Sequence, residues 1–186
     1  MRILLMKWKN GMTVLNDYTD IVLDTNILSD FLAIYFENSI SIGEKFVSKY
    51  RVNNDFASKI NTIILDHIND GISKYGKIVA SNFAFIELAR RFDECSSGRF
   101  TVDQFRAFID SPPEWFVLES VSSDLFFELY RLPSHVLFKE EKQTIEWADA
   151  IHCATALIRG NRSLFATSDS RLNVIQIFNH RLLCIT

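Results

Sequence analysis

Four segments of the sequence place a carboxylate where an apolar run gives way to a polar turn or a helical pattern. Asp24 ends the run Ile-Val-Leu, and Asp169 follows the run Leu-Phe-Ala-Thr-Ser. Glu87 lies just under two turns into a helical pattern that begins directly after the β-branched run 78–80, and Asp149 lies in an Ala-rich helical pattern. Ligands of open parallel sheets bind at the carboxyl ends of the strands, so these positions indicate one shared site.

A cluster of carboxylates at one edge of a sheet requires a cation. Two unit charges ~4 Å apart at an effective dielectric of ~20 repel each other by about 4 kcal/mol. Ligands that are all oxygen select Mg²⁺ or Mn²⁺ over zinc or copper. Such ions activate water and hold phosphoryl oxygens during in-line displacement, so the pattern indicates phosphodiester chemistry.

Each acid taken alone also has a structural interpretation. Asp24 could cap the helix that follows it. Glu87 could form a surface ion pair with Arg90 or Arg91, three and four residues further on. Asp169 could bond to the backbone of its own turn. The order and placement of the acids together, and no single one of them, favour the site.

Asp149 is the acid with the strongest individual signal. The segment 146–157 is apolar nearly all round, which predicts a helix packed on two sides. An ionised carboxylate in such a helix is costly unless it is paired or bound to a metal ion. His152 is a neighbour, but no residue four positions away could join it as a zinc ligand, so we interpret it as structural.

Alternating strand and helix patterns must position these acids. The apolar runs that predict strands alternate with longer helical patterns, which favours βαβ units and a mainly parallel sheet of about five strands; the runs are 20–23, 78–80, 115–118, 164–166 and 182–185. Capping boxes begin at Thr101 and Ser41. We therefore predict one α/β domain over residues 1–186, with an N-terminal extension at 1–18 and a helical insert at 37–76.

Composition limits the class of protein. The chain has 186 residues, a net charge of −3 and 48% apolar residues, as in a globular domain. Six Gly and three Pro argue against an all-β fold. Three scattered cysteines, no signal-peptide core and no long apolar run predict reduced thiols, a cytoplasmic location and no membrane partner.

The acidic net charge offers no general basic surface for nucleic acid, so the arginines near the acids are the candidate phosphate contacts: Arg90, Arg91, Arg159, Arg162 and Arg171.

The four acidic segments resemble the motifs of PIN-domain nucleases, in the same order. The resemblance runs from about Ile21 to the C-terminus and is greatest to VapC-type toxin ribonucleases. It implies a three-layer α/β/α fold, dependence on Mg²⁺ or Mn²⁺, and endonucleolytic hydrolysis of RNA. It also implies a toxin role with an antitoxin protein as partner. The residues it carries over are Asp24, Glu87, Asp149 and Asp169 as catalytic metal ligands, with Asn26, Thr167 and Ser168 as polar supports.

Two other phosphate-related motifs are incomplete in this sequence. A haloacid-dehalogenase-like phosphatase needs a second Asp where Asn26 stands, and the Gly-rich segment 71–78 precedes a strand where a phosphate loop must open a helix. A PIN-like module that binds RNA or protein without cutting is the alternative that stays open. An amphipathic helix over 56–68 should pack its isoleucine-rich face on the domain or on a second copy in a homodimer.

Overall fold

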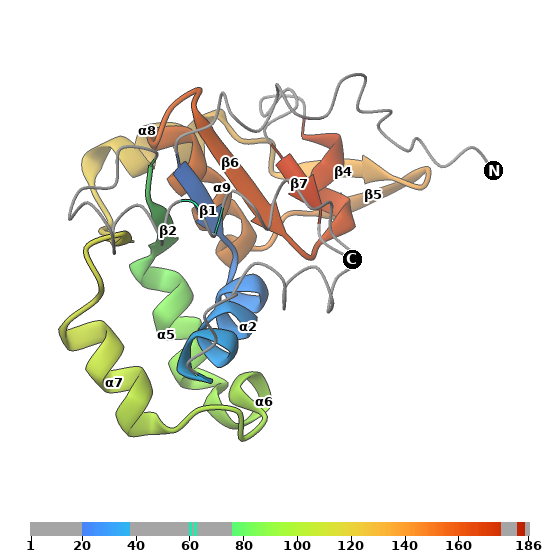
Figure 1. Cartoon of the computed structure of the whole chain (residues 1–186). Coiled ribbons are helices and arrows are strands. Elements are labelled where there is room, and N and C mark those ends of the chain that lie inside the picture. The colour runs from blue at the N-terminus through green and yellow to red at the C-terminus, as the bar shows by residue number, and fades with distance from the viewer. Residues whose placement is uncertain (1–19, 38–59, 61, 63–75, 176–181, 185–186) are drawn as a thin grey trace.

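The centre of the protein, seen in a computed structural model, is a sheet of five parallel strands (Figure 1). The structure describes residues 20–37, 60, 62, 76–175 and 182–184. In spatial order the strands are β3 (Phe116–Glu119), β2 (Ile78–Ser81), β1 (Asp20–Leu23), β6 (Ser163–Thr167) and β7 (Leu182–Cys184). All five predicted strands are confirmed, each within one residue at either end.

Side chains alternate along the strands and form an apolar core on each face of the sheet. Ile21 and Leu23 belong to one core cluster, whereas Val22 between them belongs to the other. The first cluster is rich in aromatic rings, including Phe31, whose ring lies 5.9 Å from that of Trp115. Because both faces are buried, the strands are continuous apolar runs.

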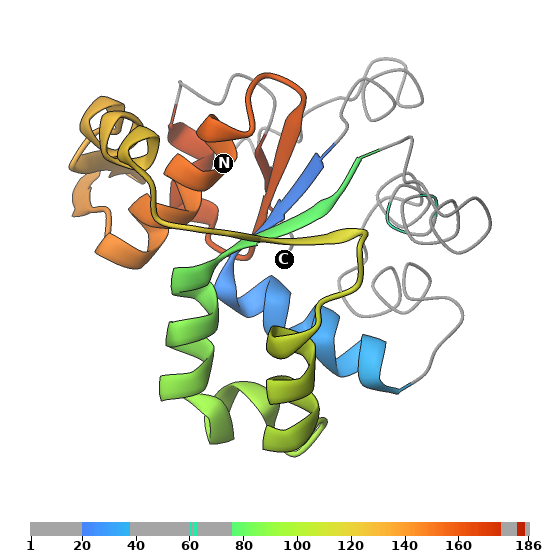
Figure 2. The same cartoon turned by 90° about the vertical axis from the view of Figure 1, so that its left-hand side faces the viewer.

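Helices cover both faces, as Figure 2 shows from the side. The aromatic face is covered by α2 (Thr25–Phe36), α5 (Asn82–Arg90), α6 (Phe92–Ser96) and α7 (Val102–Asp110). The other face is covered by α8 (Ser123–Arg131), α9 (Trp147–Ile158) and the short 3₁₀ helix η1 (Ser170–Val174). This α/β architecture is compatible with the three-layer arrangement that the sequence predicts.

Helix starts follow the capping signals of the sequence. The predicted box at Thr101 is present in both directions, because the Thr101 hydroxyl accepts from the Gln104 N–H and the Gln104 side chain accepts from the Thr101 N–H. In α9 the residues 152–157 are all buried, as predicted for a helix packed on two sides. Its first turn departs from that prediction, since Trp147 is 75% exposed.

A small antiparallel hairpin, β4 (His135–Phe138) with β5 (Glu141–Thr144), was not predicted. Its two-residue turn is Lys139-Glu140, and both residues have positive φ, 51° and 68°. Such turns usually contain Gly or Asn, which tolerate this conformation. The sequence therefore carries no turn signal at this point, and neither the apolar β4 (His-Val-Leu-Phe) nor the polar β5 (Glu-Lys-Gln-Thr) alternates between apolar and polar residues.

Several sequence predictions fall outside the described residues. These are the N-terminal extension 1–18, nearly all of the insert 37–76, the helix over 56–68 with its packing, and the capping box at Ser41. Cys95 and Cys153 are free and buried, in agreement with the prediction of reduced thiols. Among the described helices, none has the length and apolar character needed to cross a bilayer.

Candidate active site

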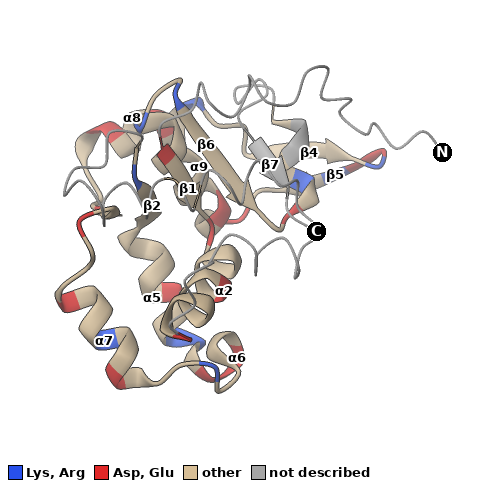
Figure 3. Cartoon of the chain, viewed as in Figure 1, with Lys and Arg blue, Asp and Glu red and all other residues tan. Residues whose placement is uncertain are grey.

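The fold brings the four predicted acids to one edge of the sheet, at the carboxyl ends of its strands. Asp24 follows β1, and Asp169 lies two residues beyond β6, which pairs with β1 in parallel register. Glu87 lies in α5, which starts directly after β2, and Asp149 lies in the first turn of α9. Figure 3 shows the acidic positions of α5 and α9 in red beside these strand ends.

Asp24 serves as a helix cap and also ties two strand ends together. Its Oδ1 accepts from the backbone N–H of Ile27 at 2.7 Å, and its Oδ2 accepts from the N–H of Ser168 at 2.9 Å. The side chain is almost fully buried, at 6% exposure. Burial raises the pKa of Asp24, and hydrogen bonds from Thr167, Ile27 and Ser168 oppose that shift without cancelling it. The capping and site interpretations are therefore compatible.

Asp149 and Asp169 share one guanidinium. Arg171 Nη2 lies 3.2 Å from Asp149 Oδ2 and 2.5 Å from Asp169 Oδ2. Burial and the nearby charge of Asp169 raise the pKa of Asp149 to about 6, against the opposing charge of Arg171. Burial also acts on Asp169, but its hydrogen bonds with Arg171 prevail and lower its pKa. The two carboxylates thus have opposite shifts within one bridge.

The buried thiol of Cys153 is subject to the charges of three of the acids. The pKa of this buried thiol is raised well above its ordinary value by burial, and then by the charges of Asp149, Asp169 and Asp24. Three negative groups therefore act on one point in the interior. The site carries an excess of negative charge that Arg171 only partly neutralises.

Glu87 is held by partners that differ from the surface ion pairs considered above. Its Oε2 accepts from the Thr25 hydroxyl at 2.5 Å and lies 3.2 Å from His152 Nε2. The hydrogen bond with His152 is the main cause of a lowered pKa of Glu87; burial opposes it and the Thr25 hydrogen bond adds to it. Arg91 instead pairs with Glu94, at 2.9 Å.

The three predicted polar supports lie in the same contact network. Asn26 Nδ2 donates to Ser168 Oγ at 3.1 Å, which joins the start of α2 to the turn after β6. Thr167 Oγ1 accepts from the Asp169 N–H at 3.0 Å and bonds to the Asp24 carboxylate. These side chains fix the backbone from which Asp24 and Asp169 project.

The donor chemistry of the site suits a hard divalent cation, although the acids do not form an assembled ligand set. In the described residues no group of three or more His, Cys, Asp or Glu side chains is arranged to hold a metal ion. The four carboxylates offer only oxygen donors, which Mg²⁺ and Mn²⁺ prefer. Arg171 already supplies one positive charge between Asp149 and Asp169. The residues Asp149 and Asp169, with Asp24 and Glu87 nearby, are those that would hold the ion.

Two of the five arginines predicted to contact phosphates have contacts with Asp20, at the start of β1. Arg159 pairs with Asp20 and Glu119, and it lies ten residues, roughly 15 Å, along α9 from Asp149. The Arg162 carbonyl accepts from the N–H of Asp20, the first residue of β1. Arg90 and Arg91 stand at the end of α5, one turn beyond Glu87.

Three residues at the site were not assigned to it from the sequence: Thr25, Ser81 and His152. Thr25 follows Asp24 directly, and Ser81 ends β2 and caps α5, so both positions could have been inferred from the strand ends. His152 lies one turn after Asp149, on a helix that the apolar pattern of the sequence predicts to be buried. The contacts that join the three residues span up to 127 positions and depend on the tertiary fold.

The fold and the site together define an α/β protein with a partly neutralised acidic site at the carboxyl edge of a parallel sheet. No family model, no curated protein and no solved structure matches the chain.

Proposed function

We propose that the chain is a PIN-like, metal-dependent endoribonuclease whose catalytic acids are Asp24, Glu87, Asp149 and Asp169. The observation that carries the proposal is the placement of these acids at one sheet edge, where burial and then the charge of Asp169 raise the pKa of Asp149 to about 6. A purely structural cluster would favour complete pairing, because an unpaired buried charge is costly.

Each side chain has a task in this proposal. A bound Mg²⁺ or Mn²⁺ would activate water and stabilise charge on the phosphate. Asp149 and Asp169 provide partly buried carboxylate oxygens that share Arg171, while Asp24 fixes the turn after β6 through its bond to Ser168. Thr25 and His152 fix the orientation of the Glu87 carboxylate. Arg171 neutralises the pair and is placed to meet a phosphate oxygen once an ion takes over that role.

The test is cleavage of a labelled single-stranded RNA of mixed sequence with Mn²⁺ or Mg²⁺. We expect cleavage that a chelator abolishes and that Asp149→Asn reduces about 100-fold or more, because a neutral amide is a poor ligand for a hard cation. Asp20→Asn is the matched control, since Asp20 is also bridged to an arginine, Arg159, but is the first residue of β1, at the opposite end of that strand from Asp24. Cleavage that survives both chelator and Asp149→Asn would refute the proposal.

The toxin role, with an antitoxin protein as partner, is a narrower proposal within the same chemistry. Induced expression should then arrest growth, and Asp149→Asn should relieve the arrest together with RNA cleavage. A chain that cleaves RNA in vitro without arresting growth would keep the nuclease function and remove the toxin role.

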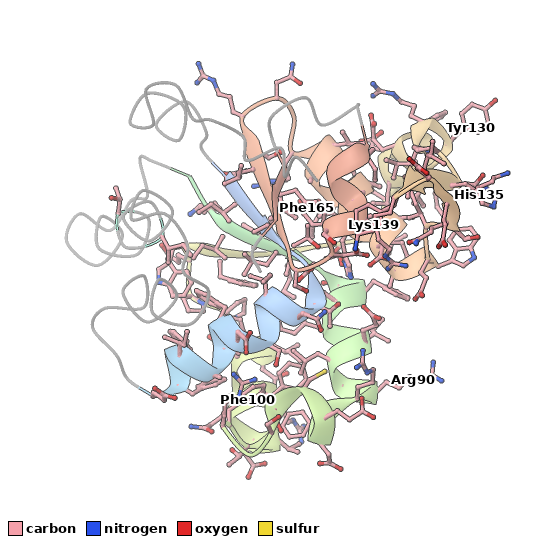
Figure 4. The ribbon with its side chains drawn as sticks, turned by 90° about the vertical axis from the view of Figure 1, so that its right-hand side faces the viewer. Arg90, Phe100, Tyr130, His135, Lys139 and Phe165 are labelled. Carbon is pink, nitrogen blue, oxygen red and sulfur yellow. The ribbon has the colours of Figure 1, made fainter. Side chains whose placement is uncertain are left out.

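Binding of RNA or protein without cleavage is the second candidate function. Exposed aromatic side chains on α8 favour it. Phe126, Phe127 and Tyr130 are exposed, Tyr130 at 91%, and Figure 4 shows Tyr130 pointing outward. Large exposed apolar patches often mark interaction surfaces. Tight RNA binding by the parent, with no cleavage under any divalent cation, would favour this candidate.

A further inference from the structure

His152 occupies the junction of the elements that carry the acids. Its side chain is 2% exposed, in the middle of α9. Nδ1 lies 3.0 Å from Ser81 Oγ, at the end of β2, and Nε2 lies 3.0 Å from Thr25 Oγ1, in the first residue of α2. Nε2 also lies 3.2 Å from Glu87 Oε2, in α5. One imidazole on α9 therefore contacts two segments that are far from it in the sequence, the start of α2 and the junction of β2 with α5.

Ser81 determines which ring nitrogen carries the proton. Its Oγ already accepts from the backbone N–H of Ala84 at 3.0 Å, as the N-cap of α5. The buried hydroxyl then needs an acceptor for its own proton, and within the described residues the acceptor at hand is His152 Nδ1. Nδ1 is therefore an acceptor, and the proton of the ring lies on Nε2.

This tautomer directs a donor at Glu87. The Nε2–H group lies 3.2 Å from Glu87 Oε2 and 3.0 Å from Thr25 Oγ1, so its proton is shared between these two acceptors, and the Thr25 hydroxyl donates to the same carboxylate oxygen at 2.5 Å. Oε2 thus receives two donors, whereas Oε1 has no hydrogen-bond partner in the described part of the chain. Two donors on one oxygen fix the orientation of the carboxylate and leave Oε1 for a ligand.

We propose that His152 is a positioning residue: held by Ser81 as the Nε2–H tautomer, it orients Glu87 so that one carboxylate oxygen is available to a divalent cation. This inference rests on the proposed function, in which Glu87 is a metal ligand. Hydrogen-bond partners of metal ligands typically change metal affinity 10–100-fold when they are removed.

The first measurement concerns the tautomer and needs no metal ion. Two-bond ¹H–¹⁵N correlation spectra of the protein labelled with ¹⁵N-histidine distinguish the two neutral tautomers and the doubly protonated ring. We expect His152 to show Nδ1 as the unprotonated nitrogen at neutral pH. A proton on Nδ1, in either the other neutral tautomer or the doubly protonated ring, would overturn the inference.

The second measurement compares two amides that replace different halves of the ring. In His152→Gln the amide nitrogen can take the place of Nε2 and still donate to Glu87, whereas in His152→Asn the shorter amide reaches only toward Ser81. Both are neutral replacements at the same buried position. We expect the Mn²⁺ dissociation constant, measured from the electron paramagnetic resonance signal of free Mn²⁺, to stay within about threefold in His152→Gln and to rise about tenfold or more in His152→Asn.

The outcomes separate the inference from the proposed function. Equal loss of Mn²⁺ affinity in both variants, with cooperative thermal melts showing that both fold, would overturn the positioning role. If neither variant folds, Ser81→Ala replaces them, and we expect it to weaken Mn²⁺ binding and to change the tautomer. A parent protein that binds no Mn²⁺ would refute the metal-dependent function, and the tautomer alone would then decide whether His152 orients Glu87.

Discussion

Two arginines near opposite ends of α9 each bridge a pair of carboxylates, and the comparison shows what distinguishes a site from a structural bridge. Arg159, which caps the C-terminus of α9, lies 2.8 Å from Asp20 and 3.2 Å from Glu119. Asp20 also accepts from the backbone N–H of Lys77 at 3.0 Å. This bridge ties the start of β1 to β3 and to α9, and its role is structural.

The bridge at Arg171 has the same chemistry in different surroundings. Asp169 receives donors from both the side chain and the backbone of Arg171. Asp149 has a single donor among the described residues, Arg171 at 3.2 Å, and its pKa is raised to about 6. The buried Asp24 lies close enough to affect the same thiol, Cys153. A bridge between an arginine and two acids is therefore not by itself a site, and the added negative charge is what sets this one apart.

The largest effect that tests this comparison is the response to metal of Arg171→Ala and Arg159→Ala. In chelator each change leaves two partly buried carboxylates without their shared cation, so we expect each to lower the free energy of unfolding by about 1–3 kcal/mol. Added Mn²⁺ should raise the melting temperature of Arg171→Ala more than that of the parent, because the ion replaces the lost charge. For Arg159→Ala the increase should equal that of the parent. Thermal melts with and without Mn²⁺ give both quantities, and equal responses of the two variants would contradict the assignment.

The strands and the edge at which the acids meet were predictable, because they depend on local signals. Apolar runs such as the one before Asp24 mark buried parallel strands, and parallel strands end at the same edge. Glu87 and Asp149 were placed correctly, because helical spacing relates each to the start of its own helix.

The partners of the acids could not be predicted, because they come from distant segments. The structural alternative for Glu87 is an ion pair with neighbours in its own helix, whereas Thr25 and His152 hold it across 62 and 65 positions. The sequence singles out Arg171 as a phosphate contact but does not reveal that it joins two carboxylates. His152 was interpreted as structural because a single histidine in a sequence gives no sign of what its two nitrogens contact.

A smaller effect separates the two acids of the Arg171 bridge. Folding raises the pKa of Asp149 from 3.8 to about 6, so the neutral form stabilises the fold. That contribution is complete below about pH 3.8 and is lost as the pH rises through about 6. Asp149→Asn keeps the group neutral, so at pH 7 in chelator we expect it to be more stable than the parent by about 1 kcal/mol after allowance for solvent screening. The difference should vanish near pH 4.

Asp169→Asn should have the opposite sign. The lowered pKa of Asp169 means that its ionised form stabilises the fold above pH 3.8 and that this contribution is lost as the pH falls through the lowered value. At pH 7 in chelator we expect this variant to melt about 2–4 °C below the parent, as for a loss of about 1 kcal/mol. Melting curves of both variants from pH 4 to 7 test the pair, and a loss of stability in both at pH 7 would show Asp149 to be a structural ion-pair partner.

The smallest expected effect concerns how RNA is held around the acids. The overall charge is −3, so binding must depend on local cations, and Arg90 and Arg91 lie at the exposed end of α5 beyond Glu87. Figure 4 shows Arg90 extending outward from that helix. Each phosphate contact contributes about 0.7 to the slope of log K against log salt for a single strand. We expect Arg90→Ala and Arg91→Ala each to reduce the slope by about that amount, measured with Asp149→Asn as the background so that the RNA stays intact.

Arg162→Ala is the matched control, because its backbone lies at the opposite end of β1 from Asp24. A slope that changes equally in all three variants would mean that RNA is attracted by total charge, and a slope that changes most in Arg162→Ala would place the RNA at the wrong end of the sheet for the proposed active site.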